Sequence, residues 1–290
     1  AGGGGGGRIA VYYATASDFD FSRVLVEGGG DGGVGTVLLQ QGDSTPVVVV
    51  RSAGRESPLP ALHGEHLVLD GAVVSATNVA VSSLWLTNGA VLTHPGAGLD
   101  TEFALRIAVD GALVVSTNSR IDVSGRGYLG GRVSGNGDVG RTLGNTAVGG
   151  SARRSGGSYG GLGASGSGDP VVNAVYGDYA NPNELGSGGG SDSNGGGNGG
   201  GLVRISANLL ALEGQILANG GNGGFWGGGG SGGGIKLQVN TLSGAGAMRA
   251  NGGNGGGGAG GCTSATTCFV EFKYWLSNDS DGGESSPNRY

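Results

Sequence analysis

Residues 202–224 read LVRISANLLALEGQILANGGNGG, and residues 235–256 read IKLQVNTLSGAGAMRANGGNGG. The two stretches align with a one-residue gap, and both end in the same signature, ANGGNGG, at 218–224 and 250–256. Such self-similarity is typical of repeat proteins, in which one unit cannot bury its apolar face alone and must stack on the next. The chain therefore predicts a stacked repeat architecture.

Alternation of apolar and polar residues dominates the chain, and we find no persuasive helical period. One motif recurs along the chain: an apolar-x-apolar run, one or two polar residues, a glycine, and then a second strand-like run. The glycines of this motif are Gly71, Gly89, Gly111 and Gly214. The first three are 18 and 22 residues apart, about one coil of a parallel β-helix, whose corners need left-handed Gly or Asn. We predict an all-β fold, a right-handed parallel β-helix (solenoid) with long glycine-rich loops.

The alternation predicts many short strands. They cover residues 8–13, 36–40, 47–51, 67–70, 72–75, 83–86, 90–93, 105–109, 113–116, 120–123, 202–206, 209–212, 215–218, 235–239, 247–250 and 269–274. Within the stacked coils, each strand is expected to pair with the strands above and below it.

Glycine is unusually abundant, with 72 residues among 290, whereas proline contributes only 7. Collagen is excluded because the sequence lacks a strict Gly-X-Y period. The glycine tracts are either mobile linkers or ordered loops stacked backbone to backbone. The repeated Asn-Gly-Gly pattern favours ordered loops, with Asn219, Asn222, Asn251 and Asn254 as structural repeat positions that form a side-chain ladder.

Composition shifts along the chain predict four regions. Residues 1–124 form β-helix coils, and residues 125–201 form a glycine-rich loop or insertion region packed on them. Residues 202–275 form further coils with the Asn-Gly-Gly repeats, and residues 276–290 form a polar tail or junction.

The formal net charge is −6, which argues against a nucleic-acid partner because phosphate binding favours a basic surface. The sequence shows neither a membrane span nor a signal peptide. Cys262 and Cys268 bracket a short turn and are either free thiols or a local disulfide. A disulfide would indicate an oxidising, extracellular setting.

Several stretches resemble large bacterial extracellular proteins of adhesin-like type with glycine-rich parallel β-helix repeats. They include GGRIAVYY, GTVLLQQG, GGSYGGLG and, most distinctively, YGDYANPNELGSGGG at 176–190. The resemblance covers nearly the whole chain and implies a secreted or cell-surface location and a structural or adhesive role. It supplies no catalytic residues.

Two acidic segments are candidates for calcium, which favours carboxylate and carbonyl oxygens on flexible loops. One carries Asp279, Asp281 and Glu284 and is otherwise a solvated tail. The other carries Asp18 and Asp20. Calcium is thus the one cofactor that the sequence suggests.

His63 and His66 form a weaker metal pair, because no third ligand is obvious. Six aromatic residues could stack on sugar rings: Trp85, Tyr159, Tyr176, Tyr179, Phe225 and Trp226. Phe225 and Trp226 stand out because they interrupt a glycine tract, so they either bind a ligand or lie across the loops and pack them.

No pair of carboxylates is fixed at the spacing that a glycosidase needs, and no nucleophilic triad can be assembled, so we expect a protein that is not an enzyme. The leading hypothesis is an extracellular structural module of a surface fibre, sheath or adhesin that stacks end to end with copies of itself through open β-helix ends. The alternatives are a carbohydrate-binding adhesin and, third, a polysaccharide lyase or glycosidase.

Overall fold

The computed structural model describes residues 2–51, 55–166 and 171–257, and within them the protein is nearly all β. A 3₁₀ turn, η1, covers Phe21–Arg23. The strands are β1 (Arg8–Tyr13), β2 (Gly35–Gln41), β3 (Val47–Arg51), β4 (Ser57–Pro58), β5 (His66–Asp70), β6 (Val73–Ser75), β7 (Asn78–Val81), β8 (Ser83–Thr87), β9 (Val91–Thr93), β10 (Leu105–Val115), β11 (Arg120–Asp122), β12 (Leu202–Leu212), β13 (Gln215–Leu217), β14 (Gly234–Ser243) and β15 (Ala247–Arg249).

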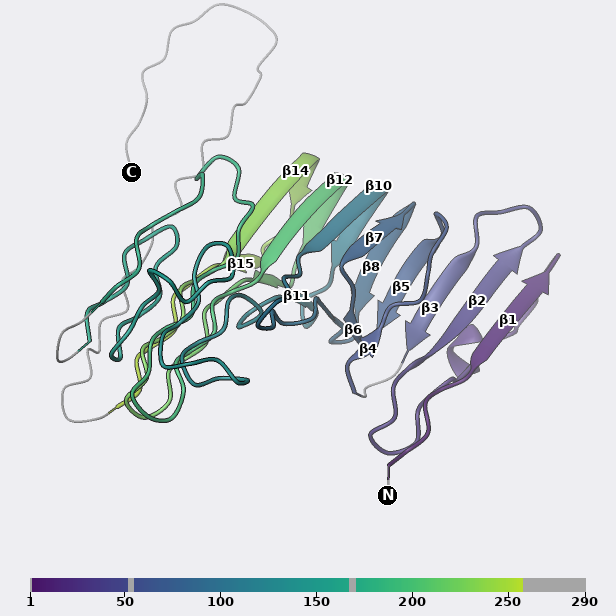
Figure 1. Ribbon diagram of the computed structural model, residues 1–290. Coiled ribbons are helices and arrows are strands. Elements are labelled where there is room, and N and C mark those ends of the chain that lie inside the picture. The colour runs from purple at the N-terminus through teal and green to yellow at the C-terminus, as the bar shows by residue number, and fades with distance from the viewer. Residues whose placement is uncertain (1, 52–54, 167–170, 258–290) are drawn as a thin grey trace, which may run out of the picture.

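The strands form two sheets (Figure 1). The large sheet has the order β1-β2-β3-β5-β8-β10-β12-β14, with β7 also paired to β10, and the small sheet has the order β15-β13-β11-β9-β6-β4. From β3 onward the chain passes back and forth between the sheets. All strand pairs are parallel except β2 with β3. The expected all-β class with parallel strands is confirmed.

The core lies between the two sheets because each strand alternates buried and exposed residues. Along β10 the buried positions include Leu105 and Ile107, with an exposed residue between them. In the small sheet, Ile121 of β11 is fully buried, as are Leu92 of β9 and Ile216 of β13. These isoleucine and leucine side chains belong to one continuous apolar cluster, and their burial is the main stabilising contribution.

The corner hypothesis is confirmed at two glycines and wrong at two others. Gly71 and Gly89 have φ of +68° and +81°, and Asn88 beside Gly89 has φ of +53°. Gly111 instead lies inside β10, where the pairing register with β12 shifts. Gly214 makes a close backbone approach, since a Cβ there would lie 2.1 Å from the carbonyl oxygen of Ser119.

The glycine tracts of residues 125–166, 171–201, 219–233 and 250–256 form an ordered bundle of hydrogen-bonded segments beside the small sheet (Figure 1). In residues 195–200 the bonds repeat every three residues: Gly196 and Gly199 donate to the carbonyls of Gly131 and Tyr128, and Gly197 and Gly200 donate to those of Gly228 and Ser231. A period of three matches a polyproline II helix, which exposes three faces to neighbouring segments. The expectation that ordered tracts pack backbone to backbone is confirmed.

This period explains the triplet Asn-Gly-Gly. A Cβ on Gly220 or Gly223 would lie 2.1 or 2.2 Å from a carbonyl oxygen of the adjacent segment, so these positions exclude any side chain. The Asn positions have room for one. The side-chain oxygens of Asn219 and Asn222 accept the backbone N–H groups of Asn251 and Asn254 at 2.9 and 2.8 Å.

The four asparagines therefore stack as repeat positions, through side chain to backbone bonds. In the sheet, by contrast, Asn240 donates its side-chain amide to Asn208 at 2.9 Å. The bundle also draws on both predicted regions 125–201 and 202–275, because the Asn-Gly-Gly tracts that follow β13 and β15 join it.

Candidate binding site at the tip of the glycine bundle

Two turns lie side by side at the far end of the bundle, and a third approaches them. Residues 218–224 lead away from β13, and residues 227–233 return to β14, with antiparallel bonds such as Gly230 N–H to the Gly221 carbonyl. Phe225 and Trp226 form the turn between them. Their carbonyls accept the N–H groups of Asn194 and Asp192, each at 3.2 Å, which joins this turn to that of residues 192–194. We call these turns, together with Arg153 and Arg154, the tip.

Phe225 and Trp226 form a stacked aromatic pair at the tip. Their ring centroids lie 5.1 Å apart with an interplanar angle of 19°. Phe225 is 51% exposed and Trp226 is 39% exposed, so neither ring is buried by the glycine segments. The pair is therefore a flat apolar surface that solvent reaches.

Arg154 fixes the position of Trp226. Its guanidinium carbon lies 4.3 Å from the centroid of the Trp226 ring, a distance suited to a cation–π contact. The Nε of Arg154 also pairs with Asp192 at 2.9 Å. Arg154 and Asp192 thus clamp Trp226, whereas Phe225 keeps the more exposed ring.

The backbone of the tip is strained. Arg153, Arg154 and Trp226 have φ of +50°, +66° and +59°, a region that non-glycine residues occupy at a cost of about 1–2 kcal/mol each. Glycine would adopt these angles without that cost, and it is the commonest residue in the neighbouring segments. Strained backbone of this kind is concentrated at functional sites, which makes the tip a candidate site.

Other predicted aromatic candidates differ in accessibility. Tyr159 is only 8% exposed and lies against Tyr176 with the two rings tilted by 47°, and the Tyr176 hydroxyl donates to the Leu185 carbonyl at 2.6 Å. Burial raises the pKa of both phenols, and Glu184 adds to the rise at Tyr159. These two rings are structural. Trp85 and Tyr179 are exposed, at 49% and 101%, but belong to no such cluster at the tip.

Buried Tyr128 and His94 hold the bundle against the sheets, and the sequence reasoning missed both roles. Burial, with Glu102 nearby, raises the pKa of Tyr128 to about 12. His94 is completely buried; its Nδ1 lies 2.7 Å from the Pro95 carbonyl, and its Nε2 accepts the Leu202 N–H at 3.3 Å. Because that N–H must donate, the neutral imidazole carries its proton on Nδ1.

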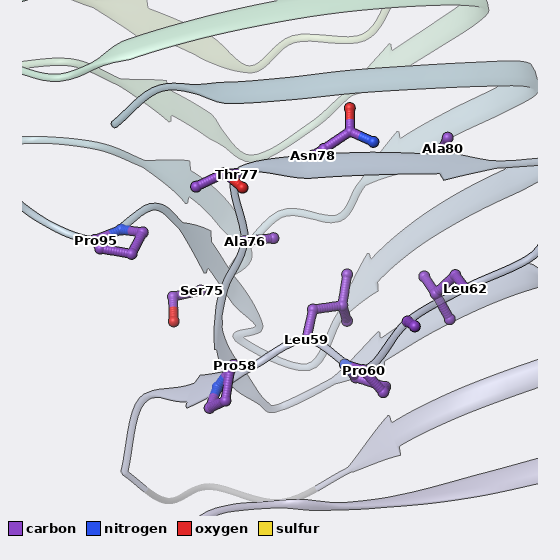
Figure 2. Close-up of a pocket in the computed structure, with 11 residues that line it drawn as sticks. Pro58, Leu59, Pro60, Leu62, Ser75, Ala76, Thr77, Asn78, Ala80 and Pro95 are labelled. Atoms are coloured by element: carbon purple, nitrogen blue, oxygen red, sulfur yellow. The ribbon is translucent and has the colours of Figure 1, made fainter. Parts of the chain in front are cut away.

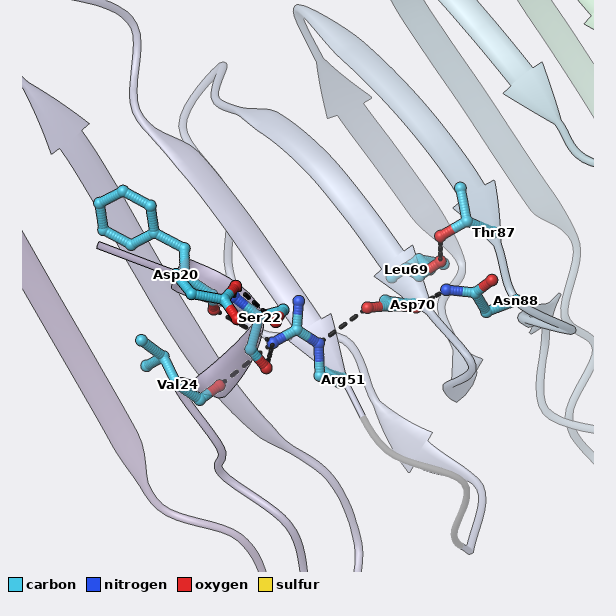
Figure 3. A network of polar contacts seen from close by, with 9 residues as sticks. Asp20, Ser22, Val24, Arg51, Leu69, Asp70, Thr87 and Asn88 are labelled. Carbon is cyan, nitrogen blue, oxygen red and sulfur yellow. Dashed lines mark hydrogen bonds and ion pairs between the residues drawn. The ribbon is translucent and has the colours of Figure 1, made fainter. Parts of the chain in front are cut away.

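The segment with Asp18 and Asp20 does not form a calcium site in this structure. Asp20 accepts the Ser22 N–H and hydroxyl at 2.9 and 2.5 Å, and these bonds lower the pKa of its carboxyl. The neighbouring carbonyls of η1 face Arg51, which also pairs with Asp70 at 2.7 Å (Figure 3). A guanidinium therefore occupies the position where these oxygens converge.

His63 and His66 are likewise not brought together with a third ligand. His66 Nδ1 lies 2.7 Å from the Ser83 hydroxyl. Across residues 2–51, 55–166 and 171–257, no group of three or more His, Cys, Asp or Glu side chains is arranged to hold a metal ion. Cys262, Cys268, Asp279, Asp281 and Glu284, and the predicted strand 269–274, lie outside the described residues.

Comparison with family models, curated proteins and solved structures finds no match to this chain. The tip is therefore interpreted from its own geometry. In the described part of the chain, no helix has the length and apolar character needed to cross a membrane.

Proposed function

We propose that this chain is an extracellular adhesive module that binds carbohydrate at the tip. In this proposal the two sheets wind as a right-handed parallel β-helix, and the glycine bundle is a rigid support for the tip. The alternation of the chain between two parallel sheets supports the winding. The exposed, stacked pair of Phe225 and Trp226 on a strained backbone is the observation that carries the binding function.

The chemistry of the tip favours a neutral sugar. A pyranose ring has an apolar face that can lie on the exposed Phe225 ring, and residues 192–194, whose backbone is bonded to that of Phe225 and Trp226, bring polar groups to the same tip for its hydroxyls. Arg154 is already paired with Asp192, so this ion pair adds no net charge to the site. Phe225 is then the contact residue and Trp226, held by Arg154, its positioning residue.

Two variants separate these roles. Phe225→Ala is expected to weaken binding about tenfold, because it removes the stacking surface. Trp226→Gly is expected to weaken binding while leaving the free energy of unfolding within about 1 kcal/mol, because glycine relieves the positive φ as the cation–π contact is lost. Binding is measured by a glycan array followed by calorimetric titration of the best neutral glycan.

Tyr179→Ala is the matched control, since Tyr179 is fully exposed and lies outside the tip. It should bind as the wild type does. Failure of every neutral glycan to bind, or equal binding by wild type and Phe225→Ala, would count against the proposal.

A second proposal, end-to-end stacking into a fibre or sheath, has its own support. β1 and β14 end the large sheet, and within the described residues each pairs on one side only. The unpaired edge of a strand attracts another strand. Because β2 and β3 are antiparallel and the other pairs parallel, β1 runs opposite to β14, so a head-to-tail contact would be an antiparallel pair.

Ala10→Pro tests the stacking. The bond from Thr36 N–H to the Gly7 carbonyl fixes the β1–β2 ladder so that the N–H of Ala10 faces outward. Proline there removes an edge donor without breaking that ladder. Light scattering at high concentration should show assemblies of the wild type and fewer of the variant. A strictly monomeric wild type would rule out stacking between molecules.

A further inference from the structure

Strand β7 is paired along one edge only. Its residues pair in parallel with β10, Asn78 opposite Arg106 and Ala80 opposite Ala108, and the Arg106 N–H donates to the Thr77 carbonyl at 2.9 Å. In a parallel ladder this bond means that the backbone N–H and C=O groups of alternate residues point toward β10, and these residues are Thr77, Val79 and Val81. The backbone N–H and C=O groups of Asn78 and Ala80 therefore point to the opposite edge. Within the described residues no hydrogen bond from another segment reaches them.

The segment that lies next to that edge, residues 59–65, does not pair with it. Residues 59–65 are tied to the neighbouring coil at both ends: Leu59 N–H donates to the Ser75 carbonyl at 2.9 Å, and Ser82 N–H donates to the Glu65 carbonyl at 3.0 Å. Between these ties lies Pro60, which has no N–H to give to a ladder. A strand partner for β7 is therefore absent from this coil.

The result is a groove of about 550 Å³ between the β7 edge and residues 58–62 (Figure 2). One wall carries Asn78 and Ala80, and the other carries prolines, leucines and Ala61. Leu59 and Leu62 pack against the core, which fixes that wall. The groove is thus built from ordered strands and from a segment tied at both ends.

The lining of the groove restricts its ligand. Among the described residues, its lining contains no charged side chain and no aromatic ring, so it offers neither an ion-pair partner nor a stacking surface for a sugar or a base. Besides the side chains of Ser75, Thr77 and Asn78, its polar groups are backbone donors and acceptors at strand spacing. Their complement is another extended backbone with the same spacing of N–H and C=O groups.

We propose that this groove binds an uncharged, extended peptide segment of a partner protein, which adds a strand to the free edge of β7. Backbone pairing with Asn78 and Ala80 provides affinity, and the prolines and leucines opposite select small or β-branched side chains. The site is separate from the tip and does not depend on sugar binding there.

The probe is the capped pentapeptide acetyl-TVAVT-amide, which is uncharged and has high strand propensity. Titration into the ¹⁵N-labelled full chain should shift the amide resonances of Asn78 and Ala80 and slow their hydrogen exchange. The same peptide with alternate amides N-methylated keeps its side chains but loses half of its donors. It should bind on the order of tenfold more weakly or worse.

Ala80→Pro provides a protein-side test. It removes one groove-facing donor and leaves the groups that bond β10, so the chain should keep its fold and bind the pentapeptide about tenfold more weakly. Val79→Pro is the contrasting variant, because it removes a donor to β10 and should destabilise the protein. The N-methylated peptide tests the wild-type chain and does not depend on how either variant folds.

Four results would overturn the proposal. The first two are no binding of the pentapeptide at millimolar concentration and equal binding of its N-methylated form. The third is protection of the Asn78 and Ala80 amides from hydrogen exchange in the protein alone at all protein concentrations. The fourth is protection of these amides in the protein alone that grows with protein concentration. The third would mean that another part of the same chain fills the groove. The fourth would mean that a second copy fills it.

Discussion

At the scale of single residues, glycine serves two different purposes in this chain. At the sheet corners, Gly71 and Gly89 provide positive φ. In the bundle, the glycines instead allow segments to approach until backbone meets backbone. A Cβ on Gly197 would lie 1.9 Å from the Gly221 carbonyl oxygen, whereas one on Gly137 would contact nothing within 4 Å.

This contrast gives a matched pair of substitutions. Gly197→Ala should lower the free energy of unfolding by about 3 kcal/mol, because the added methyl group collides with a backbone that cannot move alone. Gly137→Ala should leave stability unchanged or slightly raised, since alanine restricts the unfolded chain. Chemical denaturation of both variants measures the difference, and equal stabilities would show that the bundle is not close-packed.

At the scale of elements, the sequence predicted the strands well and the bundle poorly. The alternation located most strands of both sheets, although it split β10 at Gly111, whose bulge it treated as a corner, and split β12 at Ala207 and Asn208. It missed β4 and β7, which have two and four residues. The Asn-Gly-Gly repeat predicted ordered loops with a ladder of asparagine side chains, and the structure shows that each bond of this ladder runs from a side-chain oxygen to a backbone N–H.

The signal that was overlooked is the local period of three in NGGNGG. It predicts a polyproline II helix, with three residues per turn, in which two faces are closed to side chains and one face is open. The pairing of Phe225 with Trp226 was suggested by their interruption of a glycine tract. The contributions of Arg154 and Asp192 depend on turns distant in sequence, so no local pattern could indicate them.

His94 connects the two sheets, since it bonds the first residue of β12, in the large sheet, from a position just after β9, in the small sheet. The pKa of His94 is lowered to about 4, and burial is the largest cause. The bond to the Pro95 carbonyl opposes this shift, the charge of Arg126 adds to it, and the charge of Glu56 opposes it. The folded state therefore binds fewer protons than the unfolded state between pH 6.5 and 4. Stability should be full above pH 6.5 and fall by about 3 kcal/mol as the pH drops to 4.

The variant His94→Gln removes this titration. Between pH 6.5 and 4 its free energy of unfolding should fall less than that of the wild type, and the difference should be about the amount that His94 contributes. Above pH 6.5 the variant should be less stable than the wild type, because the bond to Leu202 is perturbed. Parallel pH profiles for wild type and variant would disprove the assignment of a neutral, buried His94.

At the scale of the whole molecule, a two-sheet core supports a bundle that owes its order to backbone hydrogen bonds more than to apolar burial. The two parts are joined next to β13 and β14, because residues 218–224 run directly from β13 and residues 227–233 run directly into β14. The account of the tip requires that this bundle be rigid. An aromatic pair on mobile loops would lose conformational entropy on binding and would not hold a fixed orientation.

Residue-resolved hydrogen exchange of the full chain tests that requirement most directly. The account predicts that the amides of Gly196, Gly197, Gly199, Gly200, Gly221 and Gly230, each bonded to a neighbouring segment, exchange as slowly as those of β10. Exchange of these glycines at the rate of an unstructured peptide, with β10 still protected, would contradict it.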